Sequence, residues 1–452
     1  MVHQIKALRM LETLVAFPSV SADPGRHDAL LKTADYLRAC LIEMGFEVEC
    51  VSSASPRPLI CGYFHTANAT ETVGVYLHYD VQPADPLEQW TSPPFELTSR
   101  DGKLYGRGVA DDKGHIAQCM QALRELIGSG TLAYSVVVLI EGEEEAGVAA
   151  FEHLLRDVHV VDLADVHAWY VLDMGMHDED TPQICTGLRG IVSGEIVIRT
   201  AQADAHSGIF GNRIYSASQL LTSALGAVKD MHTGEVKIPD FYADMQRIPN
   251  GEYASLVAHA DSRDSMQSQA QSLTLPARHF VPNIYPPDMP LALTSKLVPS
   301  FEINGIWSGY IGDGAKTIIP SVASAKFSVR TVQGQSGEHM KKRIHAYFAG
   351  IIPSGVEWNA TLSYSDAVGV SSDGEWIVRA ARILENHFRN TVVFDRSGGS
   401  IPAVEVLSRL YDKPIIMMGF TLPDENIHAP NENISEKLFF EGIEVLKKLF
   451  SK

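Results

Sequence analysis

The feature that most constrains this chain is an alternation of strand and helix patterns over its first 185 residues. Three near-continuous apolar runs are typical of strands covered on both faces, and they span residues 73–81, 134–144 and 167–175. Amphipathic helix patterns precede or separate these runs, at 3–16, 27–45 and 115–130. The alternation predicts an α/β domain of three layers with a mostly parallel sheet, whose functional groups lie at the carboxyl ends of the strands.

From about residue 187 to residue 374 the pattern changes to strands in which apolar and polar residues alternate. Such strands are expected at 194–203, 323–332 and 356–365, and helices at 213–231 and 336–350. A Pro-, Ser- and Gln-rich insertion extends to about residue 300. The segment therefore predicts a small α+β domain of ferredoxin-like type, with helices on one face of its sheet.

After residue 374 the buried pattern returns, with elements expected at 375–388 (helix), 413–420 (strand) and 435–450 (helix). The sequence thus predicts a first domain built from residues 1–186 and 375–452, into which residues 187–374 are inserted.

Composition excludes several classes of partner. The formal charge of -18 argues against nucleic acid and against an anionic membrane surface. No stretch approaches the roughly 18 apolar residues of a membrane span, and the first residues read as an amphipathic helix, not a signal peptide. Five scattered cysteines without a C-x-x-C pair favour a reducing, cytoplasmic location over a disulfide framework or a thiolate zinc site.

Histidines and carboxylates collect at or after the ends of the expected strands. Two histidines and three carboxylates would suit a pair of divalent metal ions, and the motifs that supply them are His78-x-Asp80, Asp111-Asp112, Glu144-Glu145, Asp173 and His428. Each motif alone has a simpler interpretation, such as a solvated acidic turn or a surface histidine. Their combination predicts a metal-dependent hydrolase.

The spacing within these motifs suits that chemistry. Asp80 lies two residues from His78 on the same side of a strand, so its carboxylate can accept the second ring N–H of the histidine. The glycine-rich loop around Asp111 fits neither dinucleotide nor phosphate loops, and a carboxylate bridging two metals is the better use. Glu144 and Glu145 leave a strand in opposite directions. One can bind metal while the other, kept ionised by the cations, acts as a general base.

With these residues in order, the chain resembles the M20 metallopeptidase family, and within it the carnosinase-like dipeptidase branch. The resemblance runs nearly from end to end. It covers the segments LVAFPSVS, LHYDVQP, GRGVADDKG, EGEEEAG, VLDMG, GLRG, DAHSG, KTIIPSVASAKFSVR, SGGSIP and IHAPNE.

The resemblance implies a role for each matching residue. Asp111 would bridge two metals, with His78 and Asp173 completing one site and Glu145 and His428 the other. Glu144 would be the general base and Asp80 the partner of His78. His206 would reach across a homodimer interface, formed by the inserted lid and dimerisation domain, to polarise the scissile carbonyl. The positions expected to contact the substrate are Thr317, Arg330 and Ser400.

The resemblance also bears on the substrate. Asp at position 173 is usual in dipeptidases and aminopeptidases, whereas Glu is usual in members that remove acyl groups. The expected substrate is therefore a small peptide with a free amino group, and the alternative is an N-acyl-amino-acid amidohydrolase. A non-catalytic scaffold member is a further alternative. Ser397 and Asn212 depart from the pattern, at positions where Glu and Gly are common.

Two divalent metal ions are the expected cofactors. Zinc is the first choice, with manganese and cobalt left open by the oxygen and imidazole ligands.

Overall fold

The computed structural model describes residues 2–146, 150–260 and 289–451. The chain divides into two compact units, of which the first is made of Met1–Thr186, Val370–Asp395 and Ile401–Lys452. The second comprises Gly187–Gly369 and Arg396–Ser400. Residues 396–400, expected in the first domain, belong to the second unit because Arg189 Nε donates to the Gly398 carbonyl at 2.8 Å.

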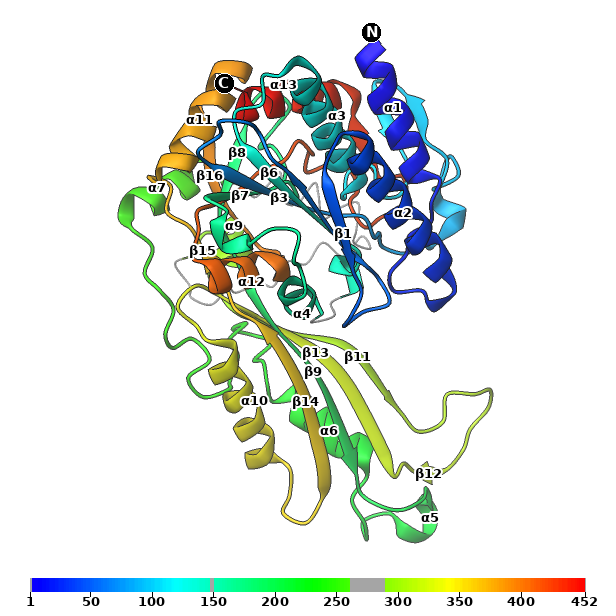
Figure 1. Ribbon diagram of the computed structural model, residues 1–452. Coiled ribbons are helices and arrows are strands. Elements are labelled where there is room, and N and C mark those ends of the chain that lie inside the picture. The colour runs from blue at the N-terminus through cyan, green and yellow to red at the C-terminus, as the bar shows by residue number, and fades with distance from the viewer. Residues whose placement is uncertain (1, 147–149, 261–288, 452) are drawn as a thin grey trace. The chain divides into compact units, whose positions relative to one another are not determined.

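The first unit is built on a mixed sheet with parallel strands at its centre (Figure 1). Adjacent strands follow the order β1 (Glu47–Val51), β2 (Leu59–Phe64), β6 (Ser135–Glu141), β3 (Thr72–His78), β7 (Ala168–Val171), β17 (Ile415–Met417), β8 (Gln183–Leu188) and β15 (Val368–Gly369), and β16 (Val393–Ser397) pairs with β8. The four central strands β6, β3, β7 and β17 are parallel to one another, and the strand pairs at both margins are antiparallel. The predicted α/β class is confirmed.

Helices cover both faces of this sheet. One face packs in a single apolar core with α1 (Val2–Val15), α2 (His27–Glu43), α3 (Lys113–Ser129), α11 (Glu375–Phe388) and α13 (Glu436–Phe450). The other face is covered by α4 (Phe151–Arg156) and α12 (Pro402–Tyr411), through the ring contacts Tyr76–Phe151 and Trp169–Tyr411. Gly74 leaves room for Trp169, since a Cβ at residue 74 would lie 2.1 Å from that indole. These contacts form the three predicted layers.

The elements are shorter than their sequence patterns where the chain turns towards the candidate site. The strand expected at 73–81 ends at His78, the strand at 134–144 ends at Glu141, and the strand at 167–175 ends at Val171. Apolar residues just beyond these points, such as Tyr79 and Leu172, stay buried. Their N–H groups still donate to the carbonyls of Glu141 and Tyr76 on the neighbouring strands. The long apolar patterns therefore reflect burial, and the strands end earlier than these patterns because the chain turns.

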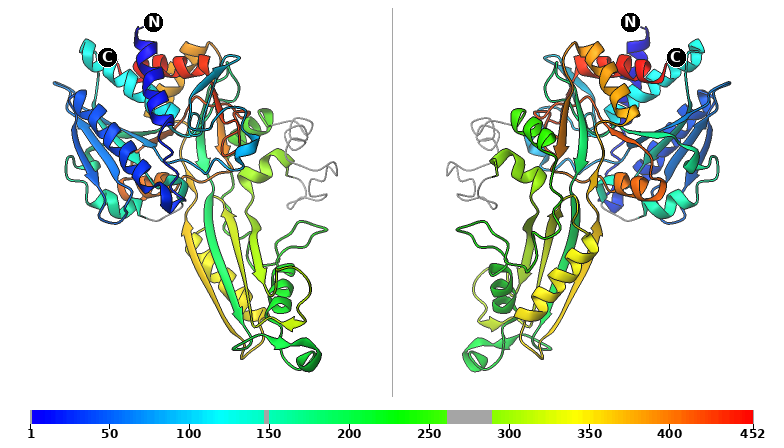
Figure 2. Two further views of the ribbon diagram at one scale, coloured as in Figure 1. Left: turned by 90° about the vertical axis from the view of Figure 1, so that its right-hand side faces the viewer. Right: turned by 90° about the vertical axis from the view of Figure 1, so that its left-hand side faces the viewer.

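The second unit has a four-stranded antiparallel sheet in the order β11 (Ser300–Ser308), β13 (Val322–Thr331), β9 (Gly190–Arg199), β14 (Glu357–Ser365). Along the chain the order is β9, α6 (Ala217–Gly226), β11, β13, α10 (Gly337–Ile351), β14, which is the ferredoxin-like connectivity. The helices α6 and α10 pack on one face around Phe327 and Phe348 (Figure 2). The predicted α+β domain is confirmed, although α6 is shorter than the expected helix at 213–231.

Smaller elements complete the two units. In the second unit these are β10 (Ala205–His206), α5 (Ser207–Phe210), α7 (Asn250–Ala258), α9 (Leu291–Leu297) and β12 (Ile318–Ile319). In the first unit, β4 (Thr98–Arg100), β5 (Lys103–Tyr105) and β18 (Asn433–Ser435) form a three-stranded sheet. The middle of the insertion expected before residue 300 lies outside the described residues. Within the described ranges, each helix is too short or too polar to span a bilayer.

Candidate metal centre

The motif residues of the first unit converge at the carboxyl ends of its central strands. His78 is the last residue of β3, and Asp173 follows β7. Glu144 and Glu145 lie in a single 3-10 turn, Glu144–Ala146, just after β6. Asp111 precedes α3, and His428 comes from the loop before β18. Since β6, β3 and β7 are adjacent and parallel, their carboxyl ends meet at one edge of the sheet.

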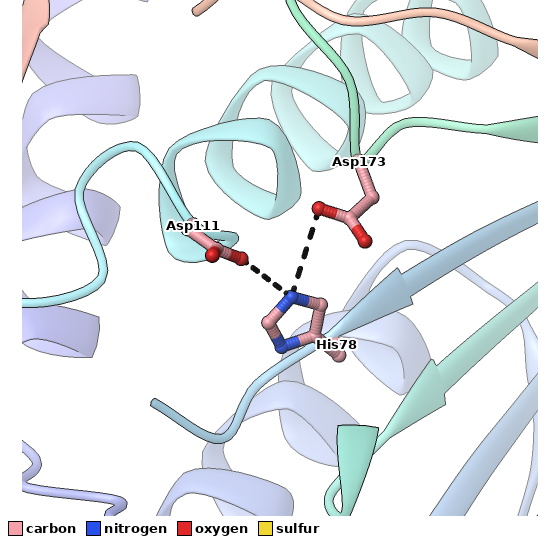
Figure 3. A group of neighbouring side chains, drawn as sticks. All are labelled: His78, Asp111 and Asp173. Atoms are coloured by element: carbon pink, nitrogen blue, oxygen red, sulfur yellow. Dashed lines mark hydrogen bonds and ion pairs between the residues drawn. The ribbon is translucent and has the colours of Figure 1, made fainter. Parts of the chain in front are cut away.

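Asp111 is the centre of two ligand groups. Its Oδ1 lies 2.8 Å from His78 Nε2, and its Oδ2 lies 2.8 Å from His428 Nε2. In Figure 3, Asp111 and Asp173 face the same ring nitrogen of His78, with Asp173 Oδ1 at 3.9 Å. Glu145 Oε1 lies 2.9 Å from His428 Nε2. The ligand atoms of His78, Asp111 and Asp173, and those of Asp111, Glu145 and His428, lie within 4.8 Å of one another in each group.

The hydrogen bonds of His78 leave one of its nitrogens facing only carboxylates. Nδ1 is 3.1 Å from the backbone carbonyl of Asp80, which fixes the tautomer with its proton on Nδ1. The lone pair of Nε2 then points at oxygens of Asp111 and Asp173, an arrangement that only a proton or a cation can stabilise. Glu145 Oε1 is buried and faces His428 Nε2 at 2.9 Å, so this carboxylate oxygen likewise points at a ring nitrogen. Two divalent cations therefore fit the residues present.

The carboxylate of Asp80 has a different main partner from the one expected. Its Oδ1 accepts from Glu144 N at 3.2 Å and its Oδ2 from Glu145 N at 3.0 Å. The distance from Asp80 Oδ1 to His78 Nδ1 is 3.5 Å, longer than the contact of that nitrogen with the backbone carbonyl of Asp80. Asp80 thus supports His78 chiefly through its main chain, while its side chain fixes the turn that carries Glu144 and Glu145. That turn is not the extended segment expected from the sequence.

Crowding of carboxylates in a buried site shifts their pKa values. Burial raises the pKa of Asp173 to about 7, and the charge of Asp111 adds to this shift. Burial likewise raises the pKa of Glu144 well above its usual value, and the negative charges of Asp173, Glu145 and Asp111 act in the same direction. Hydrogen bonds with Asp111 and Glu145 raise the pKa of His428 to about 10. Protons thus occupy this group in the absence of cations, as is usual for metal ligands.

Asp112 and His115, to which the sequence motifs assign no role, support the backbone of His78. Asp112 Oδ2 accepts from His78 N at 3.1 Å, and its Oδ1 lies 2.6 Å from His115 Nδ1. His115 Nε2 in turn accepts from Phe420 N at 2.9 Å, so the ring donates to Asp112. In the sequence, only the pairing of Asp112 with Asp111 indicates that Asp112 belongs to the site. His115 lies in the amphipathic helix pattern at 115–130, and its sequence context does not distinguish it from other helix residues.

The remaining predicted site residues belong to the second unit, where the structure brings them together in two pairs. His206 lies opposite Ile318 in the β10–β12 pair, and the carbonyl of the adjacent Thr317 accepts from Ser207 N at 3.1 Å. Arg330 Nη1 donates to Ser400 Oγ at 2.7 Å.

Both departures from the family pattern have a local structural role. Asn212 takes a left-handed φ of 61°, a conformation that asparagine tolerates where glycine is common. Ser397 Oγ accepts from Gly399 N at 3.0 Å, which closes the turn before Ser400.

Overlapping histidine and carboxylate groups at the carboxyl ends of a parallel sheet define a metal-dependent hydrolase. The chain belongs to the peptidase family M20/M25/M40, whose family model matches residues 74–452. It is 26% identical to a Cys-Gly metallodipeptidase of Schizosaccharomyces pombe, over 96% of this chain and 93% of that protein. It is 24% identical to the Beta-Ala-His dipeptidase of Mus musculus, over 99% of this chain and 93% of that protein.

The fold also matches a solved structure of the same family. An M20 family metallo-carboxypeptidase from Sulfolobus solfataricus superimposes with a TM-score of 0.86 at 23% identity, over 98% of each chain. The resemblance drawn from the sequence motifs is confirmed at the level of the family and the fold.

Proposed function

We propose that this chain is a metal-dependent dipeptidase, which hydrolyses the peptide bond of short peptides that have a free amino group. The observation that carries the proposal is the position of Asp111, whose two oxygens each lie 2.8 Å from a different histidine Nε2. A carboxylate between two histidines is suited to bridge a pair of cations. The similarity to proteins named as Cys-Gly and Beta-Ala-His dipeptidases supports the substrate class.

Two divalent cations would be held by the residues of the first unit, with Asp111 shared. His78 and Asp173 would complete one position, and Glu145 and His428 the other. When bound, the cations would polarise the scissile carbonyl and lower the pKa of the attacking water. We propose zinc, because a few histidine and carboxylate ligands are typical of its sites. Manganese and cobalt accept the same ligand types and are the alternatives.

Glu144 would move the proton. Its backbone N–H is held by Asp80 Oδ1, so the side chain projects from a fixed turn beside the ligand groups. With cations present, the raised pKa of Glu144 falls back and the carboxylate can accept a proton from the attacking water. The same carboxyl group then delivers that proton to the leaving amine.

Arg330 and Ser400 would bind the terminal carboxylate of the peptide. Burial lowers the pKa of Arg330, and within the described residues it has no carboxylate at ion-pair distance. A guanidinium that is partly buried beside a hydroxyl is a suitable partner for a substrate carboxylate. Thr317 is exposed beside β12 and would contact the substrate from the same unit as His206.

The substrate class is tested by comparing free dipeptides with acylated amino acids. We expect the zinc-loaded chain to hydrolyse Ala-Ala, Cys-Gly or β-Ala-His and to leave N-acetyl and N-succinyl amino acids intact. Amine release is measured after chelation and again after zinc is restored. Hydrolysis of only the acylated compounds would replace this proposal by the amidohydrolase alternative. Hydrolysis of none would favour a scaffold member, although all five ligand positions and Glu144 are present in this chain.

We further propose that the chain forms a homodimer through the second unit. Apolar side chains are exposed along its edge strand β11 and around α5, and they are Ile209, Phe210, Ile214, Tyr215, Ile303, Ile306, Trp307, Tyr310 and Ile311. An exposed apolar edge strand is a common site of pairing between chains. His206 Nδ1 accepts from Gly208 N at 3.0 Å, which leaves Nε2 as a donor for a substrate carbonyl in the partner's site.

A heterodimer of two inactive variants tests this arrangement. One subunit carries His206→Ala and the other Glu144→Gln, and the two are co-expressed with different tags and purified by both. If His206 acts in the partner's site, one of the two sites has both residues and the heterodimer has about half of wild-type activity. If His206 acts in its own subunit, each site lacks one residue and the heterodimer is inactive. Failure to isolate any heterodimer would contradict the dimer itself.

The location proposed for the enzyme is the cytoplasm. The side chains of Cys40, Cys50, Cys61 and Cys119 are present as thiols, as is usual in a reducing compartment.

A further inference from the structure

A buried carboxylate behind the ligand groups contacts the loop that carries Asp111. Glu432 Oε2 accepts from Gly108 N at 2.9 Å, and Oε1 accepts from Ala110 N at 2.9 Å and from Asp111 N at 3.1 Å. The Glu432 side chain is 1% exposed. Three backbone donors of this loop thus converge on one side chain, which the sequence places four residues after His428.

Arg107 is the counter-ion of this carboxylate and extends the network to the segment that follows His78. Its Nη1 donates to Glu432 Oε2 at 2.6 Å, and its side chain is also 1% exposed. Its Nη2 donates to the carbonyl of Pro83 at 3.1 Å and to the carbonyl of Ala429 at 3.3 Å. The guanidinium carbon lies 5.4 Å from the centre of the Trp90 ring. One ion pair therefore joins the segments that follow His78, precede Asp111 and follow His428.

These segments lack regular structure of their own that would fix the ligands. His428 has a left-handed φ of 63°, and its neighbours Asn426 and Asn431 have φ values of 55° and 62°. Non-glycine residues keep this conformation only where surrounding contacts impose it. Gly108 also takes a positive φ of 86°, which turns its N–H towards Glu432. The contacts that hold both loops in place converge on Glu432 and Arg107.

We infer that Arg107 and Glu432 are a positioning pair, which sets the separation of Asp111 from His428 and through it the affinity of the chain for its two cations. The inference rests on the proposed metal-dependent function. Neither residue belongs to the ligand groups, so both act through the loops that they hold. Partners behind metal ligands orient those ligands, and a ligand held too loosely loses affinity. The pair also needs both members, because a buried charge left alone is unfavourable.

The chain offers a matched control in the same loop. Glu425 is as buried as Glu432, and it also accepts from two backbone N–H groups, those of Leu422 at 2.8 Å and Ser435 at 2.7 Å. Within the part of the chain that the structure describes, its side chain accepts no hydrogen bond from the segment that carries Asp111. Substitution of Glu425 therefore reports the general effect of weakening the loop, and substitution of Glu432 adds the effect on Asp111.

The test is zinc binding by the metal-free full-length chain, measured by calorimetry against a competing chelator. E432Q preserves the shape of the side chain but replaces one acceptor by a donor. We expect its zinc affinity to fall by about tenfold to a hundredfold, with turnover restored by excess zinc. R107K keeps the charge but loses the separate contacts of Nη1 and Nη2, so its zinc affinity should also fall. E425Q should bind zinc as the wild type does, and circular dichroism verifies that each variant is folded.

The outcomes separate this inference from the proposed function. Wild-type zinc affinity in a folded E432Q or R107K would overturn the positioning role, and so would an equal loss of affinity in E425Q. A wild-type chain that binds no zinc would overturn the metal centre and this inference together. Loss of turnover in E432Q that excess zinc leaves unchanged would also count against a role in metal affinity.

Discussion

Replacing Glu144 by glutamine is expected to lower kcat by a factor of about 100 to 10,000 while both metal ions stay bound. Glutamine has the same size, and its backbone N–H can still be held by Asp80 Oδ1 at 3.2 Å. The amide, however, accepts no proton from water and has none to deliver to the leaving amine. KM should change little, since Glu144 lies outside both ligand groups and outside the residues proposed to bind the substrate carboxylate.

The measurement is steady-state kinetics on a free dipeptide together with the metal content of the purified variant. Glu141→Gln is the matched control, because Glu141 ends the same strand β6 but accepts from the Tyr76 hydroxyl at 2.6 Å. Burial raises the pKa of Glu141 to about 8, so its carboxyl is largely protonated at pH 7 and an amide is a close substitute. A fully metal-loaded Glu144→Gln variant with wild-type kcat would refute the role of Glu144.

The second large effect is expected for Asp111→Asn, which should abolish both metal binding and turnover. Asp111 is the only residue shared by the two ligand groups, and each of its oxygens faces a separate histidine at 2.8 Å. An asparagine offers one neutral oxygen and turns an NH2 group towards the other histidine. Zinc affinity should therefore fall by more than the roughly hundredfold typical of losing a partner behind the ligands.

Elemental analysis of the variant after equilibration with zinc, with kcat measured in parallel, tests this prediction. Asp112→Asn provides the comparison, because Asp112 is adjacent and fully buried but belongs to neither ligand group. Its carboxylate contacts the backbone N–H of His78 and the ring of His115. We expect Asp112→Asn to lose stability and to retain two zinc ions at saturating concentration. Two tightly bound zinc ions in Asp111→Asn would contradict the bridging role.

The sequence predicts those parts of the fold that depend on local periodicity. The helix expected at 27–45 is α2, which ends at Glu43, two residues before Gly45 with its φ of 91°. The alternating pattern at 356–365 is β14, and that at 323–332 is β13. In β14 half-buried and exposed residues alternate, and α2 buries one side of the helix, so these patterns follow directly from packing.

Long-range contacts determine where several elements end, which local periodicity does not predict. The run at 73–81 continues as apolar sequence beyond the end of β3, because Tyr79 and Val81 are buried in the turn that follows the strand. The prediction of a strand that reaches Glu144 was wrong, because β6 ends at Glu141 and the Asp80 carboxylate holds Glu144 and Glu145 in a 3-10 turn. The short strands β1 and β2, of five and six residues, were not among the strands expected from the sequence.

The proposed ligand residues were predictable from the sequence, because metal binding requires histidine and carboxylate side chains and several of these follow apolar strands. The residues behind them were not. Glu432 and Arg107 are charged residues in polar loops, where the sequence indicates solvent exposure. Their mutual contact at 2.6 Å and their hydrogen bonds with backbone groups make their burial possible. Charged side chains that stabilise a site from behind thus become visible only when the loops are assembled.

The most direct test of the central claim is to titrate the metal-free chain with zinc while following hydrolysis of a free dipeptide. The geometry around Asp111 predicts that the chelated chain is inactive and that activity rises to a plateau near two zinc ions per chain. Full activity in a chain stripped of metal, or no hydrolysis of any free dipeptide once two zinc ions are bound, would contradict the assignment of this protein as a metal-dependent dipeptidase.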